Sequence, residues 1–450
     1  MVPMSIFPLR VHMAAIHTNI EGCRSSGTYM AFRDALSAAT LVSDEVSLIH
    51  EMFDISRASG HEMLIFDNIE QSPGHRVAIN FLTRTRICEA LDIEPEEFLD
   101  LLQWAMNNPS IPEVVEEGLV QQCTQSPVDM TALPIPHHWR EDRGRYMSAS
   151  VIIAEQDDIR NMSFHRQFLR DENHVVARLV PRHLRTMTDK SLAGNKELPI
   201  AIINAPDPVV LLAAAMSFDH NLDELTVAAA LHEKIYSRPL QLVKLPNGIS
   251  VPADAEYAMW GCITQECDDE GPYVDITGTV DDVRQEPVIR IDGVHHRQDP
   301  IFHALIPAAS EHITLMGLPR APTIKQAVNE VCECLDVHMT EGGCGWLAAV
   351  VKIKVNGPDD ARNAIMAALA GHRSMKMVTI VDSDIDIEDP VRVEWALMTR
   401  WQPDRDTIIL SGEKGSSLDP TRDENGLTSK IGYDACIPYG LDHGPFTSVQ

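Results

Sequence analysis

The stretch Glu270-Gly-Pro-Tyr-Val-Asp275 places two carboxylates on either side of a Gly-Pro bend. About one hundred residues earlier, Asn161-Met-Ser-Phe-His-Arg166 supplies an amide oxygen, a hydroxyl and a guanidinium. Arg182 and His183 follow the apolar run from Val175 to Val180, which is typical of a buried strand. Side chains of these kinds can hold an anion, a metal ion and a proton donor in one place. We therefore interpret these stretches as parts of one active site.

The order of these motifs is more informative than any one of them, because a Glu-Gly-Pro sequence alone is usually only a turn. The chain carries Asn-x-Ser-x-x-Arg, then Pro-x-His, then a glutamate about forty residues further on, then Glu-Gly-Pro-x-x-Asp. In this order the motifs resemble the UbiD family of prenylated-flavin decarboxylases. The resemblance extends from about Thr28 to Ala435 and is strongest between Asn161 and Thr279.

Further motifs follow in the order in which that family carries them. They are Val251-Pro-Ala-Asp-Ala-Glu256, Glu311-His312, Leu315-Met-Gly-Leu-Pro319, Gly415-Ser-Ser-Leu-Asp-Pro420 and Lys430. The chain departs from the family pattern at three places. Trp260 stands before Gly261 where Glu is frequent, Met162 stands where an aromatic residue is common, and residues 1–27 match no part of the pattern.

The size and charge of the chain limit the classes of protein it can belong to. Its 450 residues exceed what one hydrophobic core usually supports, so two or three domains are expected. With 37 basic and 66 acidic residues the formal net charge is −29, which disfavours nucleic acid and anionic membrane surfaces as partners. Nine cysteines without a Cys-x-x-Cys pair indicate neither a disulfide framework nor a zinc site.

The most apolar region, Pro199 to Phe218, is interrupted by Pro206-Asp-Pro208 and leaves segments too short to span a bilayer. It predicts a strand, a turn and a helix, with Asp207 as N-cap and Pro208 at the first helical position. No secretory signal is evident at the N-terminus. We expect a cytoplasmic protein without a membrane span.

The apolar runs divide the chain into three regions, and together they predict an α/β fold. Residues 1–118 predict an α/β layer, and residues 322–450 predict a second one. Residues 119–310 hold short apolar strands separated by Gly, Pro, Asn and Asp, which is typical of a barrel or a sandwich. The resemblance implies that the central region is a split β-barrel of the flavin-reductase type. It also implies that the C-terminal domain mediates oligomerisation, as a homodimer or a homohexamer.

Local signals predict the individual elements. Ser43 can cap a helix through Ile55, and Pro95 opens another helix. A helix from Thr323 to Leu335 would make Cys332 and Cys334 ordinary helical thiols. The other predicted helices are Asp359–Leu369 and Val391–Thr399, and the predicted strands are Met63–Phe66, Val77–Phe81, Ala149–Ala154, Val175–Val180, Ile200–Ile203, Leu240–Val243, Val288–Ile291, Leu347–Val355, Met377–Val381 and Thr407–Leu410.

The chemistry that the resemblance implies is non-oxidative decarboxylation. Loss of CO2 from an sp2 carbon leaves a carbanion that side chains cannot delocalise, so an electron-sink cofactor is required, in this family prenylated FMN. The resemblance implies that Arg166 binds the substrate carboxylate, that Glu270 is its acidic partner and that Asp275 donates the proton. Burial close to Glu270 is expected to raise the pKa of one of the two carboxyl groups, and Arg166 opposes this.

The resemblance also implies a metal site at the cofactor phosphate. Asn161, His183 and Glu224 match the ligands of a divalent cation, and this hard donor set suits Mn2+ or Mg2+. Beside it, a site for K+ (or Na+) would share Glu224 and use backbone carbonyl oxygens of Ala213, Ala214 and Met216. The residues implied to contact the flavin are Asn161, Met162, Ser163, Phe164, Arg182, His183 and Lys430.

The sequence leaves the substrate open. His303, Glu311, His312, Met316 and Leu318 lie in segments that line the pocket in relatives, and this mixed lining favours a small carboxylic acid. One hypothesis is a reversible decarboxylase of a heteroaromatic acid (furan, pyrrole or indole type) or another α,β-unsaturated acid. An alternative is the archaeal trans-anhydromevalonate 5-phosphate decarboxylase. A flavin prenyltransferase would supply the cofactor in both. An alternative of another class is a non-catalytic flavin-binding or assembly protein, suggested by Trp260 and the unmatched N-terminus.

Overall fold

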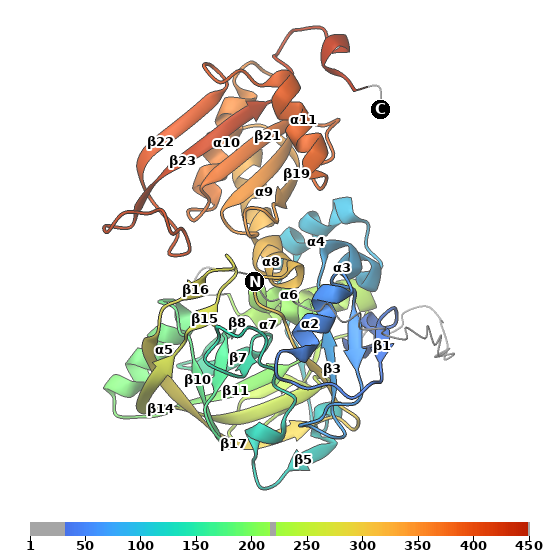
Figure 1. The fold of residues 1–450 in the computed structure, drawn as a ribbon, viewed down its shortest axis with the longest axis vertical. Helices are drawn as coiled ribbons and strands as arrows, with labels where there is room; N and C mark the ends of the chain where they lie inside the picture. The colour runs from blue at the N-terminus through green and yellow to red at the C-terminus, as the bar shows by residue number, and fades with distance from the viewer. Residues whose placement is uncertain (1–31, 217–221, 449–450) are drawn as a thin grey trace, which may run out of the picture.

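The computed structural model describes residues 32–216 and 222–448. The first 31 residues of the predicted N-terminal region, and Phe218, lie outside this part of the chain. Figure 1 shows the N-terminal and central elements together in one body and the C-terminal elements in a second body above it. Helix α8 (Ser310–Gly317) lies where the two bodies meet (Figure 1).

The N-terminal region is an α/β layer, as its sequence predicts. Its sheet has the order β1-β2-β3-β18, so a strand from far along the chain completes it. The strands are β1 (Thr40–Val42), β2 (Leu64–Phe66), β3 (Arg76–Ile79) and β18 (Ile301–His303), and the helices are α1 (Phe32–Ala35), α2 (Glu51–Ala58), α3 (Arg84–Leu91) and α4 (Pro95–Asn107). The predicted start of α4 at Pro95 is confirmed.

The central region is built on a large sheet with the order β6-β9-β10-β17-β14-β11-β7-β8, and β5 pairs with β17. Its strands are β5 (Cys123–Gln125), β6 (Tyr146–Met147), β7 (Val151–Gln156), β8 (Ile159–Phe164), β9 (Gln167–Leu169), β10 (His174–Ala177), β11 (Leu198–Asn204), β14 (Tyr257–Glu270) and β17 (Arg284–His296). A smaller sheet joins β4 (Glu113–Val115), β12 (Gln241–Lys244) and β13 (Ser250–Pro252), and β15 (Tyr273–Val274) pairs with β16 (Val280–Asp281).

The large sheet separates two hydrophobic cores, and β11 shows why. Successive side chains of a strand point to opposite faces. Ala201 and Ile203 belong to the core that α6 (Pro208–Ala215) and α7 (Glu224–Tyr236) share, whereas Ile200 and Ile202 belong to the second core. Both faces of β11 are therefore covered, which explains its continuous apolar sequence.

Helix α6 is buried along its whole length, in keeping with its apolar sequence. Asp207 caps it by accepting a hydrogen bond from the backbone N–H of Val209 at 2.9 Å, and Pro208 is its first residue. This cap is as predicted. Among residues 32–216 and 222–448, no helix is long and apolar enough to cross a membrane.

The C-terminal region is a five-stranded sheet with helices on both faces. The strand order is β19-β20-β21-β23-β22, from β19 (Glu333–Met339), β20 (Ala348–Lys354), β21 (Met377–Asp382), β22 (Thr407–Lys414) and β23 (Leu427–Ala435). Val351 packs in one core with side chains of α9 (Ala321–Asn329) and α10 (Asp360–Gly371), whereas Val350 packs in another core with α11 (Pro390–Arg400).

Two predicted helices are wrong. The helix expected from Ser43 begins only at Glu51, because Val46 and Ile49 form isolated β-bridges and Ser43 instead donates to the carboxylate of Asp67 at 3.1 Å. The helix expected to reach Leu335 ends at Asn329. The following residues form β19, where pairing with β20 overrides a local pattern that also fits a helix. Cys334 is therefore a strand residue rather than a helical one.

The predicted strands all occur, but β17 and β22 are much longer than their apolar runs. Strand β17 extends from Arg284 to His296 around the predicted Val288–Ile291. The added residues are mostly polar and include Pro287 and Gly293, so a search for apolar runs does not detect them. Trp260 of β14 pairs in register with Gly293 of β17, and its indole fills the space above that glycine. Packing thus accounts for the tryptophan that departs from the family pattern.

Gly261 permits the close contact of β14 with β17. The register shifts between Trp260 and Gly261, and a Cβ at Gly261 would collide with the backbone carbonyl of Arg290. We expect Gly261→Ala to lower the free energy of unfolding by about 1–3 kcal/mol, the usual cost of overpacking. Thermal and denaturant unfolding would measure this. Gly342→Ala is the control, because a Cβ there meets open space; equal stability of the two variants would contradict the account.

Candidate functional site

The structure brings Arg166, Glu270 and Asp275 together, although more than one hundred residues separate Arg166 from Glu270. Arg166 lies in the short connection between β8 and β9, and Glu270 is the last residue of β14. Asp275 follows β15, so the antiparallel pair of β15 and β16 carries it toward Arg166. Gly271 adopts a positive φ of 94° at the bend, a conformation that favours glycine.

The Arg166 guanidinium donates four hydrogen bonds to three carboxylates. Its Nε and Nη2 donate to the two oxygens of Glu270, both at 2.8 Å, which is the bidentate geometry of a strong ion pair. Nη1 donates to Asp275 at 2.8 Å, and Nη2 also donates to Asp281 at 2.8 Å. An incoming carboxylate that is to be held by two N–H groups must therefore displace Asp275 or Asp281.

Burial and charge oppose each other at this cluster. The side chain of Arg166 is 9% exposed and that of Glu270 is fully buried, whereas Asp275 and Asp281 are 24% and 22% exposed. Burial alone would lower the pKa of Arg166, but the hydrogen bonds and charge of Glu270 outweigh it and raise this pKa above its ordinary value. The guanidinium carbon also lies 4.5 Å from the centre of the Tyr273 ring.

Asp281 is a site residue that the sequence analysis missed. It accepts from Arg166 and, at 2.7 Å, from Arg284. Burial opposes its charge, but these two guanidinium groups outweigh burial and lower the pKa of Asp281 below its usual range. Its spacing from Asp275 could have revealed it. A short hairpin between the two residues returns the chain to Arg166, so that Asp281 lies beside Asp275.

Asp142 is a second acid that the motifs did not reveal. It is 6% exposed and accepts hydrogen bonds from the backbone N–H of Val274 at 2.8 Å and of Trp139 at 3.4 Å. Burial raises the pKa of Asp142 to about 6, and the positive charge of Arg166 works in the opposite direction. Asp142 thus holds the backbone at Val274, the residue before Asp275.

The predicted pocket-lining residues separate into two kinds. Glu311 accepts from His303 at 2.9 Å and from the backbone N–H groups of Asn80, Phe81 and Leu82, so this fully buried pair fastens α8 to the N-terminal region. His312, in contrast, lies close enough to the cluster for its pKa to respond to the charges of Asp275 and Arg166, although burial is the main cause of its lowered pKa.

Two of the three predicted ligands of the divalent metal are in direct contact. The Nδ2 of Asn161 donates to Glu224 at 3.0 Å, and the backbone N–H of Met162 donates to the same carboxylate at 2.9 Å. Burial raises the pKa of Glu224 to about 7. A bound cation would stabilise the ionised form of this carboxylate and so oppose the effect of burial. His183 begins α5 (His183–Ala193), and both α5 and α7 contact β8.

The donor set fits a hard cation. Oxygen atoms of Asn161 and Glu224 with one imidazole are the ligands that Mn2+ or Mg2+ prefers. Within the described part of the chain, no three His, Cys, Asp or Glu side chains converge on one point, so a metal here depends on the amide of Asn161. Ser163 donates to the Oδ1 of Asn161 at 3.0 Å and holds that amide in place.

The residues of the predicted monovalent site lie at the C-terminal end of α6. Ala213, Ala214 and Met216 are all buried there, and the carbonyl oxygen of Ala213 accepts the backbone N–H of Met216 at 3.2 Å. Helix α6 contacts α7, which Glu224 begins.

The other predicted flavin contacts come from two bodies of the structure. Ser163 and Phe164 end β8, and Arg182 is the N-cap residue of α5. Lys430 lies on β23 of the C-terminal region, where its ammonium group donates to the carbonyl oxygen of Arg373 at 2.6 Å and burial lowers its pKa. These residues can hold one ligand only if it lies where the two bodies meet.

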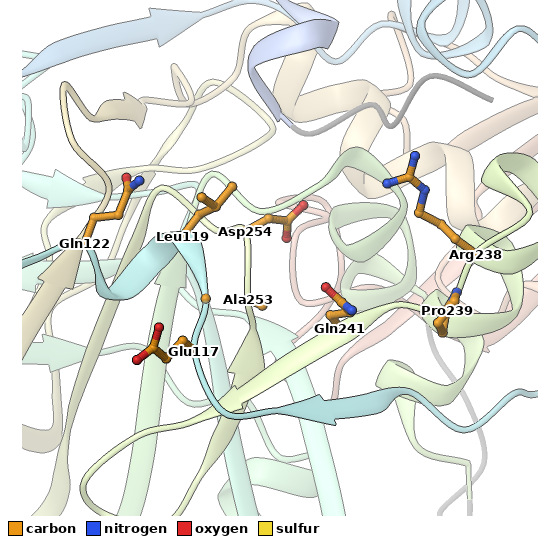
Figure 2. A pocket seen from close by; sticks show the side chains of 9 residues that line it. Glu117, Leu119, Gln122, Arg238, Pro239, Gln241, Ala253 and Asp254 are labelled. Atoms are coloured by element: carbon orange, nitrogen blue, oxygen red, sulfur yellow. The ribbon is translucent and has the colours of Figure 1, made fainter. Parts of the chain in front are cut away.

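A separate cavity of about 480 Å³ lies elsewhere. It is lined by residues of two stretches, 117–122 and 238–254, and Figure 2 shows the side chains of Arg238, Gln241 and Asp254 around it. None of the predicted catalytic or metal-binding residues lines this cavity.

Comparisons with known proteins agree with this geometry. The family model of the 3-octaprenyl-4-hydroxybenzoate carboxy-lyase Rift-related domain matches residues 113–310, and that of the corresponding C-terminal domain matches residues 313–435. Anhydromevalonate phosphate decarboxylase of Methanothermobacter thermautotrophicus is 39% identical over 406 residues, 89% of this chain and 94% of that protein.

Two solved structures are also similar along nearly the whole chain. The UbiD-class enzyme HmfF from Pelotomaculum thermopropionicum in complex with FMN is 31% identical with a TM-score of 0.88, covering 93% of this chain and 97% of that one. An evolved dimeric form of HmfF in complex with prFMN is 30% identical with a TM-score of 0.84, covering 92% and 96%. Fold and site therefore define a carboxy-lyase. The chain belongs to the UbiD family.

The raised pKa of Asp142 generates a prediction for stability. Because the folded state holds this proton more tightly than the unfolded state, the stabilisation is fully present below about pH 4 and is lost as the pH rises through about 6. Between pH 5 and 7 the free energy of unfolding of wild type should fall by about 1 kcal/mol relative to that of Asp142→Asn.

Denaturant unfolding at several pH values measures this difference. Glu141→Gln, at the exposed neighbouring residue, is the matched control and should follow the wild-type profile. Parallel profiles for wild type and Asp142→Asn would contradict the account.

Proposed function

We propose that this protein is a prenylated-FMN-dependent decarboxylase of a small α,β-unsaturated carboxylic acid. The observation that carries the proposal is the Arg166 guanidinium, held by Glu270 through two hydrogen bonds while Asp275 and Asp281 occupy its remaining sides. This guanidinium is suited to bind a substrate carboxylate, because it is planar and permanently charged and because Glu270 fixes its orientation. The partly exposed carboxylates of Asp275 and Asp281 can be displaced by the substrate.

In this proposal the three residues have separate roles. Glu270 is fully buried and orients Arg166, whereas Asp275 is partly exposed and can exchange its hydrogen bond to Arg166 for one to the substrate. Arg166 binds the carboxylate that leaves as CO2, and Asp275 in its acid form delivers a proton to the vacated carbon.

The cofactor supplies the electron sink that side chains lack. Asn161, Met162, Ser163, Phe164, Arg182, His183 and Lys430 would hold it, with Mn2+ or Mg2+ on Asn161, His183 and Glu224. The buried Glu224 carboxyl and the clamped Asn161 amide support this metal assignment. K+ or Na+ on the carbonyl oxygens of Ala213, Ala214 and Met216 would complete the site.

The proposal extends to the architecture. Residues 119–310 would form a split β-barrel that binds the flavin, between an N-terminal α/β region of residues 1–118 and a C-terminal unit of residues 322–450 that mediates oligomerisation. The likeness to HmfF structures with FMN and prFMN supports the flavin, and the dimeric form of HmfF supports self-association. A flavin prenyltransferase would supply the modified cofactor.

Among substrates, we favour trans-anhydromevalonate 5-phosphate over a heteroaromatic acid. The relative named for this activity is 39% identical over nine-tenths of the chain, which supports a common substrate. The heteroaromatic acids, which the sequence left open as substrates, become the second arm of the test. A non-catalytic flavin-binding protein is disfavoured. Burying the Arg166 guanidinium among three carboxylates carries a desolvation cost, and a protein that only binds flavin does not need this arrangement.

The test is a panel of acids offered to enzyme that is co-expressed with a flavin prenyltransferase. We expect CO2 release from trans-anhydromevalonate 5-phosphate and slower or no release from furan, pyrrole and indole carboxylic acids. Asp275→Asn is the matched variant, because it keeps Arg166 and Glu270 but cannot supply the proton. It should bind the acid normally yet lose deuterium exchange into the product by at least about a hundredfold, the usual scale of general acid catalysis.

No CO2 release and no exchange with any acid of the panel would sink the proposal. Wild-type exchange in Asp275→Asn would leave the reaction in place and assign the proton to another residue.

A further inference from the structure

Asp254 is a buried acid that the proposed reaction does not use. It lies two residues after β13 and lines the separate cavity of about 480 Å³. Asp254 is only 5% exposed, and neither oxygen of its carboxylate has a hydrogen-bond partner among the described residues. Figure 2 shows this carboxylate between Leu119 on one side and Gln241 and Arg238 on the other.

Other buried carboxylates of this chain are satisfied by the fold. Glu256, two residues further on, accepts from Arg33 at 2.7 and 2.8 Å and from the backbone N–H of Ile301 at 3.0 Å. Asp254 has no comparable donor within the part of the chain that the structure describes. Because an ionised carboxylate that is buried without a partner is costly, Asp254 requires either a proton or a cation.

The charges around Asp254 leave it ionised in most molecules at pH 7. Burial is the main cause that raises the pKa of Asp254 to about 6, and Glu256 adds to this, whereas its own backbone N–H and the charge of Arg297 oppose it. Arg297 is itself engaged elsewhere, because its Nη1 lies 3.4 Å from Glu256 and donates to the backbone carbonyl oxygen of Asp254 at 3.5 Å. Asp254 therefore presents negative charge to the cavity.

The lining of the cavity changes from its inner end to its rim. Asp254 and Ala253 are buried, whereas Leu119, Pro239 and Gln241 are exposed. The carboxylate therefore lies at the inner end of a cavity that opens to solvent, and the apolar side chains lie along the way to it. A volume of about 480 Å³ falls in the range of about 300–1,000 Å³ that is usual for small organic ligands.

The lining favours an organic cation over a metal ion. Within residues 32–216 and 222–448, no three His, Cys, Asp or Glu side chains converge as ligands of a divalent metal would. An ammonium group carries three N–H donors, which one carboxylate and water can satisfy together. Glu117 and Arg238, both exposed at the rim, carry opposite charges, so Asp254 determines the sign of the charge at the inner end. The net charge of −29 also attracts cations.

We propose that this cavity binds the ammonium group of a small aliphatic amine, with Asp254 as the acceptor and Leu119 and Pro239 against the hydrocarbon chain. The carboxylate supplies the charge, and the apolar part of the lining contacts the part of the ligand that water solvates poorly. The site is separate from the Arg166 cluster, and the inference does not depend on the proposed reaction.

The test is calorimetric titration of the full-length protein with n-butylammonium chloride and with 1-butanol, its neutral isostere, at neutral pH and constant ionic strength. Wild type should bind n-butylammonium saturably and at least tenfold more tightly than 1-butanol, and Asp254→Asn should lose this preference. Asp404→Asn is the matched control, because it removes the same charge at an exposed position outside the cavity, and it should bind as wild type does.

Thermal unfolding is the second measurement. The amine should raise the melting temperatures of wild type and of Asp404→Asn but not that of Asp254→Asn, because only a protein that binds the ligand is stabilised by it. Without the amine, Asp254→Asn should melt at the wild-type temperature or above it, because the replaced carboxylate accepts no hydrogen bond from the described residues.

Three results would each overturn the inference. The first is the absence of saturable binding of n-butylammonium by wild type. The second is equal affinity of wild type and Asp254→Asn for this amine, which would assign the binding to the acidic surface as a whole. The third is a melting temperature of Asp254→Asn far below that of wild type without the amine, which would show that the carboxylate serves the fold.

Discussion

The ion pair between Arg166 and Glu270 is the interaction on which the rest of the site depends. Its two hydrogen bonds of 2.8 Å join the end of β8 to the end of β14, two strands that the sheet order keeps apart. A fully buried carboxylate is tolerated only with such a partner, because leaving it unpaired costs several kcal/mol, about 3–5 in comparable cases. The large sheet places the two partners of this pair, and the bend at Gly271 with the hairpin of β15 and β16 brings Asp275 and Asp281 to the same guanidinium.

Charge is distributed unevenly between the two ends of the candidate site. At one end three carboxylates surround Arg166, and two of them are exposed enough to move. At the other end lie Arg182, Arg320 and Lys430, whose positive charges all act on His372. A molecule with a carboxylate that can replace Asp275 or Asp281 on Arg166, together with phosphate at the opposite end, complements both. Neither end alone would indicate this combination.

The sequence predicted those parts of the structure that local chemistry determines. The Asp207 cap, the Pro95 helix start and the apolar strands follow from hydrogen bonding and burial within a few residues, and the structure confirms them. The motif order, which resembles that of a known family, also predicted that Arg166, Glu270 and Asp275 share one site, and in the structure these three side chains are in contact.

Where tertiary contacts decide, the sequence was insufficient. The residues after Asn329 fit a helix until β20 offers them a strand partner, and the long ends of β17 carry no apolar run. The roles of Asp281, Asp142 and Arg320 were missed for the same reason. Each is an ordinary polar residue in its own segment, and only folding gives it a guanidinium, a buried backbone N–H or a cluster of like charges as neighbours.

The most direct test of the central claim, that Arg166 is the receptor for a substrate carboxylate, compares the binding of an acid with that of its neutral amide. The ligands are the saturated, unreactive analogue of the favoured substrate and its primary amide, and the dissociation constants are measured for wild type and Arg166→Gln. The account predicts that wild type prefers the acid by at least about tenfold, roughly 1.4 kcal/mol, and that Arg166→Gln loses this preference. An undiminished preference for the acid in Arg166→Gln would contradict it.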